Sequence, residues 1–200
     1  MYGKNLTQLS AYDSESGELN TIIETPKGSR NKFKYDEKLG LFELGGVMPT
    51  GSLFPFDFGF VPSTLGGDGD PLDVLVLMDE PAFPGCLVRC RLIGVIEAEQ
   101  TEEGETVRND RLIAVAANSR RHGSVKTLMS LDQVLLDEIE HFFVSYNEIK
   151  GKLFTPLGRF GPERARKLIE DGLMHLRRRA TSRRTGSKRS PKRTPKTKKR

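Results

Sequence analysis

The sequence predicts an α+β protein that is mainly β, with a small barrel of short strands and two late helices. Three observations support this class: short β-rich segments recur along the chain, turn signals separate them, and helical periodicity occurs only near the end. Many short strands followed by helices are typical of an α+β fold around a small barrel. With 200 residues, 36% of them hydrophobic, the chain can bury one ordinary core.

The expected strands are short segments rich in β-branched, aromatic or alternating residues, which favour extended backbone. The turn signals PKGSRN, GG, PTG, STLGGDGD and EEGE lie between them. The predicted strands are residues 21–24, 32–35, 41–44, 58–61, 73–78, 87–97 and 111–116.

Two helices are expected after the strands. Ser130 and Gln133 have the spacing of a capping box at the start of the first helix. Pro162, which follows Gly161, suits the first position of the second helix. The apolar stripe of the first helix is Leu131, Val134, Leu135, Ile139, Phe142, Phe143, Tyr146 and Ile149. The buried face of the second is Ala165, Leu168, Ile169, Leu173 and Leu176, where we expect this helix to end.

The net charge of +5 averages two different segments. Residues 177–200 contain 13 Lys and Arg and no acid, so 19 basic residues face all 27 acidic residues in 1–176, a balance of 19 − 27 = −8. We therefore expect one domain, 1–176, and a disordered basic tail, 177–200. The acidic body favours divalent cations over nucleic acid. The tail is open to two interpretations: a contact with nucleic acid, polyphosphate or an acidic surface, or a solubilising extension.

The chain has no apolar run of the length that a signal peptide or a membrane span needs. Cys86 and Cys90 are spaced to share one face of a strand, as small apolar residues in a reducing compartment. We therefore expect a cytoplasmic protein. Neither a Gly-x-Ser-x-Gly element nor a Walker-type loop occurs, so serine-nucleophile and P-loop chemistry are not indicated.

The stretch GGDGDPLDVLVLMDE concentrates carboxylates directly before an apolar run. Asp68 and Asp70 are two apart and leave extended backbone on the same side, while Gly69 and Pro71 shape a bend that lets Asp73 approach them. Three converging carboxylates repel unless a cation lies among them, and hard divalent cations prefer oxygen ligands. The pattern favours a metal site; the alternative is a solvated Asp-Gly turn.

The segment DGDPLDVLVL closely resembles the signature of the soluble, family I inorganic pyrophosphatases. Further segments, including IIETPKGSRNKFKYD and LDEIEHFFVSYNEIKG, resemble that family in the same order, from about residue 21 to 176. The resemblance implies an OB-like, five-stranded β-barrel flanked by two C-terminal helices. It also implies hydrolysis of pyrophosphate to two phosphates with Mg²⁺, or Mn²⁺, in a homo-oligomer, often a hexamer.

The resemblance also implies roles for individual residues. Asp68 and Asp73 would hold the first metal, and Asp70 would accept a proton from the attacking water. The remaining roles are Glu24 at the metal cluster, Lys32 and Tyr146 on phosphate, and Arg111 in place of a family lysine. Each has a structural alternative: Lys32 as a solvated lysine, Glu24 as an exposed strand end, Tyr146 as core and Arg111 as a partner of nearby acids.

Several positions depart from the family pattern. A family glutamate is replaced by Lys34, and a family arginine falls where Gly45 and Gly46 stand. Phe54 and Phe58 replace tyrosines and remove two hydroxyl groups.

Other departures affect the metal ligands and the phosphate cations. In the metal-binding Asp-x-Lys element, either Asn109 is a weakened ligand or Asp110 has taken over its role. Asn147 replaces a lysine. A further family aspartate has three candidate positions, Gln100, Thr101 and Glu102.

These departures leave two hypotheses. In the first, the protein is a Mg²⁺-dependent inorganic diphosphatase; in the second, it is a catalytically weakened phosphate-binding or scaffold protein. The complete acidic motif favours the enzyme, because metals supply most of the transition-state stabilisation in such chemistry.

Overall fold

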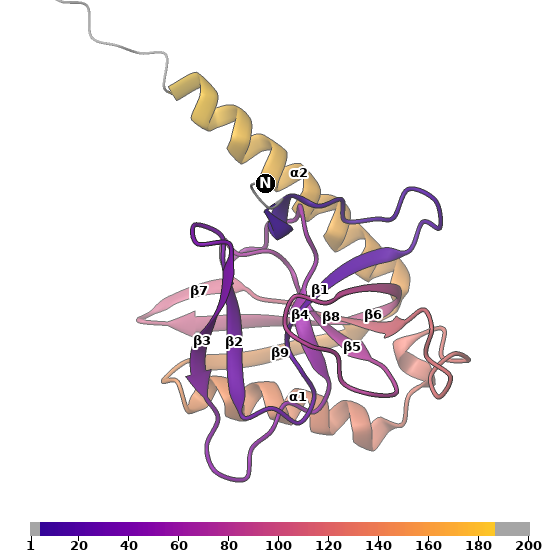
Figure 1. Ribbon diagram of the computed structural model, residues 1–200. Coiled ribbons are helices and arrows are strands. Elements are labelled where there is room, and N and C mark those ends of the chain that lie inside the picture. The colour runs from indigo at the N-terminus through magenta and orange to yellow at the C-terminus, as the bar shows by residue number, and fades with distance from the viewer. Residues whose placement is uncertain (1–4, 187–200) are drawn as a thin grey trace, which may run out of the picture.

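The computed structural model describes residues 5–186, with side chains through Ser182 (Figure 1). Its strands pair into one large sheet and a separate hairpin. The strands are β1 (Leu19–Thr25), β2 (Asn31–Asp36), β3 (Leu41–Val47), β4 (Asp57–Phe60), β5 (Asp73–Leu77), β6 (Leu87–Glu102), β7 (Glu105–Arg108), β8 (Arg111–Ala116) and β9 (Leu153–Phe160). The helices are α1 (Gln133–Glu148), α2 (Pro162–Gly186) and the short 3₁₀ turns η1 (Leu6–Gln8) and η2 (Leu128–Ser130).

Five strands of the large sheet close into a ring. They follow the order β1, β4, β5, β8, β6, and β6 pairs with β1 again. The β5–β8 pair is parallel, whereas the other pairs around the ring are antiparallel. Closure leaves these strands no free edge. The predicted fold class, a mainly β fold with a five-stranded ring and two C-terminal helices, is confirmed.

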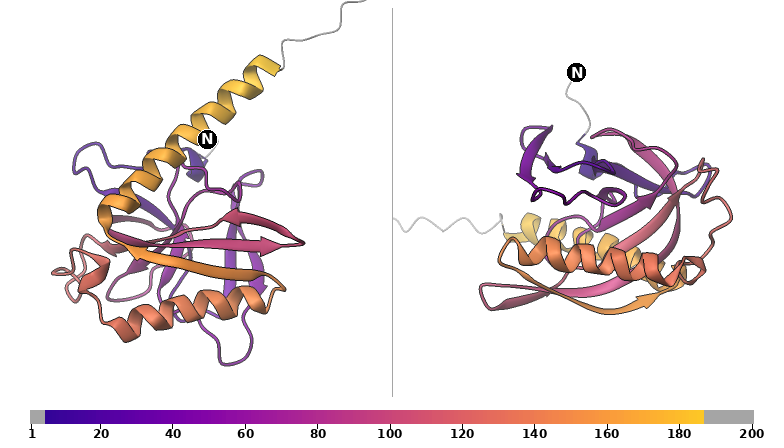
Figure 2. Two further views of the ribbon diagram at one scale, coloured as in Figure 1. Left: turned by 180° about the vertical axis from the view of Figure 1, so that it is seen from behind. Right: turned by 90° about the horizontal axis from the view of Figure 1, so that it is seen from below.

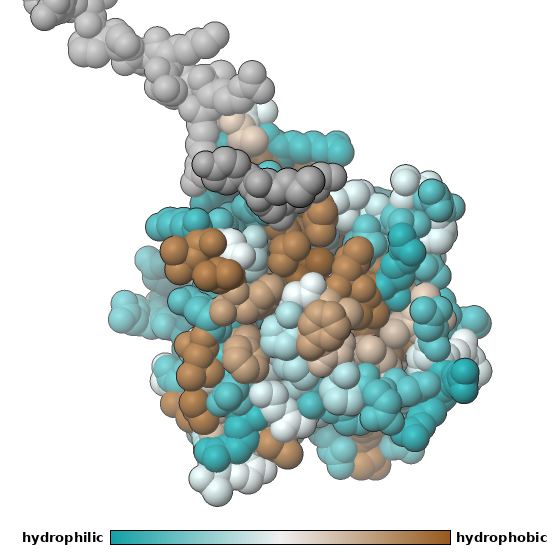
Figure 3. All heavy atoms as spheres, in the orientation of Figure 1, coloured by the Kyte–Doolittle hydropathy of each residue, from teal (hydrophilic) through white to brown (hydrophobic). Residues whose placement is uncertain are grey.

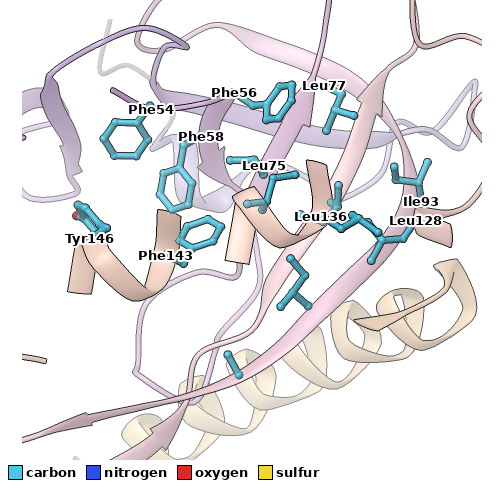
Figure 4. Close-up of a cluster of buried hydrophobic side chains, with 14 of the residues drawn as sticks. Phe54, Phe56, Phe58, Leu75, Leu77, Ile93, Leu128, Leu136, Phe143 and Tyr146 are labelled. Carbon is cyan, nitrogen blue, oxygen red and sulfur yellow. The ribbon is translucent and has the colours of Figure 1, made fainter. Parts of the chain in front are cut away.

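The apolar run of β5, VLVL, is buried on both faces. Leu75 and Leu77 belong to the core beneath α1, whereas Val74 and Val76 belong to the core that α2 covers. Successive side chains of a strand point to opposite faces, so a strand between two cores must be apolar throughout. Figure 4 shows the first core, with Phe143 of α1 beside the strand residues. Two further views show α1 and α2 on different parts of the ring (Figure 2).

Strands β7 and β9 were not predicted. Both pair with β6, which is 16 residues long and extends beyond the ring. The β9 segment contains Pro156 and Gly158, which weaken a strand signal, and its register with β6 shifts between Glu97 and Ala98. The β7 segment is only four residues long, and it follows the EEGE turn directly. Neither segment has a pattern that distinguishes it from a loop.

The predicted start of the first helix is wrong. Asp132, not Ser130, is the N-cap: its carboxylate accepts a hydrogen bond from the Val134 N–H at 2.7 Å. Ser130 belongs to the 3₁₀ turn η2, which redirects the chain before the helix begins. The apolar stripe is consequently displaced, since Leu136 is buried while Val134 and Ile149 are exposed.

The second helix begins at Pro162 as predicted, and Ala165 and Ile169 are buried. It does not end at Leu176 but continues to Gly186, because the Arg- and Ala-containing sequence that follows tolerates helix. Residues 177–186, expected to be disordered, are therefore helical. The rest of the expected tail, 187–200, lies outside the described residues, so the division into 1–176 and 177–200 stays a prediction.

Two smaller predictions concern the cysteines and membrane spans. Cys86 and Cys90 are both free thiols, and Cys90 is buried in β6. No helix within residues 5–186 combines the length and apolar character that crossing a membrane requires.

Candidate functional site

A cleft of about 1020 Å³ opens where the ring meets the β2–β3 hairpin and the end of α1. It contains every site residue predicted from the sequence except Asp110. These residues come from distant parts of the chain: Glu24 from β1, Lys32 from β2, Asp68 and Asp70 from the loop before β5, Asp73 from β5, Arg111 from β8 and Tyr146 from α1.

The loop before β5 is held by its own hydrogen bonds. The Gly66 N–H donates to the Asp70 carbonyl at 2.7 Å, and the Asp70 N–H donates to Asp68 Oδ1 at 3.1 Å. Gly69 has a φ of +88°, a left-handed conformation that glycine adopts without strain. Burial, and then the negative charges of Asp73 and Asp70, raise the pKa of Asp68 to about 6. This corner of the cleft therefore favours bound positive charge.

The expected convergence of three carboxylates is not present. Within residues 5–186, no group of three or more His, Cys, Asp or Glu side chains has the geometry of a metal site. Asp73 is held by Arg111, whereas Asp70 lies 3.9 Å from the Lys34 ammonium. The oxygen donors around Asp68 still fit a hard cation chemically, since a cation there would offset the repulsion that raises the pKa of Asp68.

Arg111 is bound to acids and amides of the protein. The parallel register pairs Val74 with Leu112, which places Asp73 beside Arg111 at the starts of β5 and β8. Arg111 Nη1 donates to Asp73 Oδ2 at 2.6 Å and to Asn109 Oδ1. The guanidinium is buried over the Phe143 ring at 5.1 Å. The structural alternative for Arg111, pairing with nearby acids, is the arrangement observed.

Asp110 does not line this cleft, but it lines a much smaller pocket together with Asp68 and Asp73. Its Oδ1 accepts hydrogen bonds from the Ala98 N–H at 2.9 Å and from Arg108 at 2.7 Å, and its role as a metal ligand stays a prediction. Asn109 lines the cleft instead. Its amide donates to Gln100 Oε1 at 3.1 Å, and two candidates for the missing aspartate, Gln100 and Glu102, line the cleft.

Glu24 is a buried cleft residue, not an exposed strand end. Its Oε1 accepts a hydrogen bond from the Tyr35 N–H at 2.9 Å, which ties β1 to β2. Burial raises the pKa of Glu24 to about 7, although this hydrogen bond and Lys32 act in the opposite direction.

Lys32 and Tyr146 lie together in the cleft. The Lys32 ammonium is 5.3 Å from the Phe58 ring centroid and 5.4 Å from that of Tyr146. Burial alone would lower the pKa of Lys32, but the Tyr146 hydroxyl and the carboxylates of Asp73 and Glu24 raise it overall. Lys32 is therefore a half-buried cation, not a fully solvated lysine.

Two lysines that line the cleft, Lys34 and Lys150, were not predicted as site residues from the sequence. Lys34 lies beside Gly45, where an added Cβ would come 3.4 Å from Lys34 Cβ, an ordinary contact distance. Lys150 contacts the Tyr146 hydroxyl. Its position four residues after Tyr146, one helical turn, is the signal that could have identified it.

The comparisons with known proteins identify the family of this chain. The family model described as inorganic pyrophosphatase matches residues 21–177. An inorganic pyrophosphatase of Synechocystis is 38% identical over 157 residues, 78% of this chain and 90% of that protein. One from Streptomyces coelicolor is 41% identical over 133 residues, 66% of this chain and 79% of that protein.

The solved structures give the same result. The inorganic pyrophosphatase of Thermus thermophilus superposes with a TM-score of 0.79 at 34% identity, covering 86% of this chain and 99% of that one. That of Neisseria gonorrhoeae gives 0.75 at 33% identity, covering 84% and 96%. The fold and these matches define a hydrolase of the inorganic diphosphatase class. The chain belongs to the inorganic pyrophosphatase family. Membership of this family implies a divalent metal cofactor.

Proposed function

We propose that the protein hydrolyses inorganic pyrophosphate to two phosphates in a Mg²⁺-dependent reaction, with Mn²⁺ as a possible substitute. The observation that carries this proposal is one cleft in which the carboxylates of Asp68, Asp70 and Asp73 face the cation of Lys32 and the hydroxyl of Tyr146. Such a cleft presents oxygen ligands to cations on one side and donors to phosphate on the other.

The metal would be held by Asp68 and Asp73, with Glu24 nearby. When bound, Mg²⁺ would polarise the phosphoryl oxygens and make water more acidic. Arg111 acts as a positioning residue, because its hydrogen bond fixes one oxygen of Asp73 and leaves the other free to coordinate. This replaces the role in substrate binding that the family resemblance implied for Arg111.

Side chains of the protein supply the proton acceptor and the hydrogen-bond donors to phosphate. Asp70 is exposed in the cleft, so its carboxylate can accept a proton from the attacking water. Lys32 and Tyr146 donate to phosphate oxygens, and the half-buried position of Lys32 strengthens its interaction with an anion.

The test is phosphate release from pyrophosphate by purified protein with and without Mg²⁺. We expect Asp70→Asn to lower kcat by roughly 100-fold or more, because a positioned general base contributes that much. Glu138→Gln, an exposed carboxyl on α1 outside the cleft, is the matched control and should retain activity. Wild-type protein that releases no more phosphate with metal than Asp70→Asn does would contradict the proposal.

A second candidate, a weakened phosphate-binding or scaffold protein, is favoured by specific observations. Phe54 and Phe58 are buried core residues without hydroxyl groups, and the Arg111 guanidinium is engaged by Asp73. In that case calorimetry would show phosphate binding while pyrophosphate stayed intact.

We also propose a cytoplasmic homo-oligomer, with a hexamer as one form that it can take. The free thiols of Cys86 and Cys90 suit a reducing compartment. Exposed apolar side chains of the β2–β3 hairpin and the loop after it gather on one side of the molecule (Figure 3), where a second copy could cover them. They are Leu39, Leu41, Leu44, Val47 and Leu53. A monomer mass by light scattering would contradict the oligomer.

A further inference from the structure

The chain turns sharply at the end of α1, and this turn presents Lys150 to the cleft. The Lys150 N–H donates to the Asn147 carbonyl at 2.9 Å, and the Lys152 N–H donates to the same carbonyl at 3.0 Å. Gly151 has a φ of +72°, which suits glycine at a helix end. The backbone that carries Lys150 is therefore fixed by hydrogen bonds, and the direction of its side chain follows from it.

The Lys150 ammonium lies against Tyr146. It donates to the Tyr146 hydroxyl and stands 4.2 Å from the ring centroid. The Lys32 ammonium lies 5.4 Å from the same centroid. Two ammonium groups, that of the half-buried Lys32 and that of the exposed Lys150, thus share one phenol, and they repel each other unless an anion lies between or beside them.

These two ammonium groups differ from three of the other cations that line the cleft, which form ion pairs. Arg111 pairs with Asp73, Lys152 with Glu102 at 2.7 Å and Lys34 with Asp70. In the part of the chain that the structure describes, the ion pairs include neither Lys32 nor Lys150. Their charges remain available to a bound anion.

Asn147, which follows Tyr146 in α1, contributes no positive charge to the cleft. Its side chain is 2% exposed and donates to the Phe143 carbonyl at 2.8 Å. The amide is uncharged and already engaged, so it adds little to anion binding. One turn of helix further on, Lys150 brings a full positive charge to the same side of Tyr146.

We propose that Lys150 is a phosphate-binding residue that, together with Lys32, holds one phosphoryl end of the substrate against Tyr146. This inference rests on the proposed function, because it assigns a ligand contact within the same cleft. Charge-assisted hydrogen bonds from the two ammonium groups hold the phosphoryl group beside Tyr146.

The test compares Lys150→Gln and Lys150→Arg with a matched control, Lys152→Gln, whose ammonium is already paired with Glu102. We expect Lys150→Gln to raise the KM for pyrophosphate roughly 10-fold, with a smaller change in kcat, as the loss of one charge-assisted contact predicts. The Kd of inorganic phosphate, measured by calorimetry, should rise similarly. Lys150→Arg should restore most of both, and Lys152→Gln should change neither.

Unchanged KM and phosphate Kd in Lys150→Gln, or equal effects of Lys152→Gln, would overturn the inference while leaving the proposed hydrolysis intact. If the wild-type protein does not hydrolyse pyrophosphate, the phosphate Kd values still test Lys150 separately. If a variant fails to fold, a measurement on the wild-type chain still tests the inference. Phosphate should slow acylation of Lys150 by an amine-reactive reagent, read by mass spectrometry, and equal acylation rates with and without phosphate would contradict the inference.

Discussion

At the scale of single residues, the cleft balances charges that would be costly if unpaired. Asp73 is held by Arg111, and the Glu24 carboxylate accepts a backbone N–H. The remaining repulsion shows in the pKa of Asp68, raised to about 6 by burial and its acidic neighbours. A site arranged in this way gains stability when cations and phosphate enter together.

Glu24 provides a prediction for pH dependence. Its pKa in the folded protein is about 7, above the ordinary value of 4.5, because burial disfavours the ionised form. The folded state therefore binds the proton more tightly, and the free energy of unfolding declines as pH rises from 4.5 to 7. For metal-free protein we expect a loss on the order of 3 kcal/mol, which Glu24→Gln should abolish.

Urea denaturation in the presence of a chelator measures this effect. Glu24→Gln should be more stable than wild type at pH 8 and nearly equal to it at pH 4.5. Glu138→Gln, exposed on α1, should follow the wild-type curve. Parallel pH curves for wild type and Glu24→Gln would show that the buried carboxyl carries no such cost.

At the scale of the elements, the backbones of β1 and β4 approach each other closely where the two strands pair. Gly59 pairs with Ile23, and a Cβ added at Gly59 would stand 1.9 Å from the Ile22 carbonyl oxygen. That oxygen is main chain and cannot move without separating the two strands. Glycine at this position is therefore required by packing.

We expect Gly59→Ala to destabilise the protein by several kcal/mol, roughly the upper range of overpacking effects, or to prevent folding. Gly46→Ala is the matched control, since no atom lies within 4 Å of its added Cβ. Urea midpoints of the two variants provide the comparison. A Gly59→Ala protein as stable as Gly46→Ala would show that the strands can separate at little cost.

Prediction from sequence succeeded where one strand or helix carries its own signal. The run DVLVL indicated β5 because both of its faces are buried, and Pro162 marked the start of α2. Prediction failed where contacts with another segment of the chain determine the local structure. Ser130 and Asp132 are both good caps, and the η2 turn selects Asp132; β9 exists because β6 extends far enough to pair with it.

At the scale of the whole molecule, the cleft residues were predicted but their contacts were not. The motif placed Asp68, Asp70 and Asp73 correctly in one cleft. The Arg111–Asp73 pair depends on the register between two strands that lie far apart in sequence, which no local pattern specifies. Likewise, the direction of Asp110 is set by Arg108 and Ala98, not by the residues beside it.

The charge asymmetry also belongs to this scale. The helical part of the basic segment extends beyond the ring (Figure 1), and Arg177, Arg178 and Arg179 on it are exposed. We expect the full chain to bind single-stranded RNA weakly, with an affinity that falls steeply with salt, because Lys and Arg displace counterions. A chain ending at Leu176 should lose this binding and keep its activity on pyrophosphate. RNA binding that survives the truncation, measured by fluorescence anisotropy, would assign it to the acidic body.

The one parallel pair of the ring affects the order in which the molecule assembles. Asp73 and Arg111 are 38 positions apart, and β6 and β7 lie between them in the chain. We expect this contact to form late in folding, because closing a long loop costs entropy before the contact can form. A ligand bound to Asp73 and its neighbours would therefore stabilise the native state but not the transition state for folding. It would slow unfolding, and so lengthen the lifetime of the native state, while leaving the folding rate unchanged.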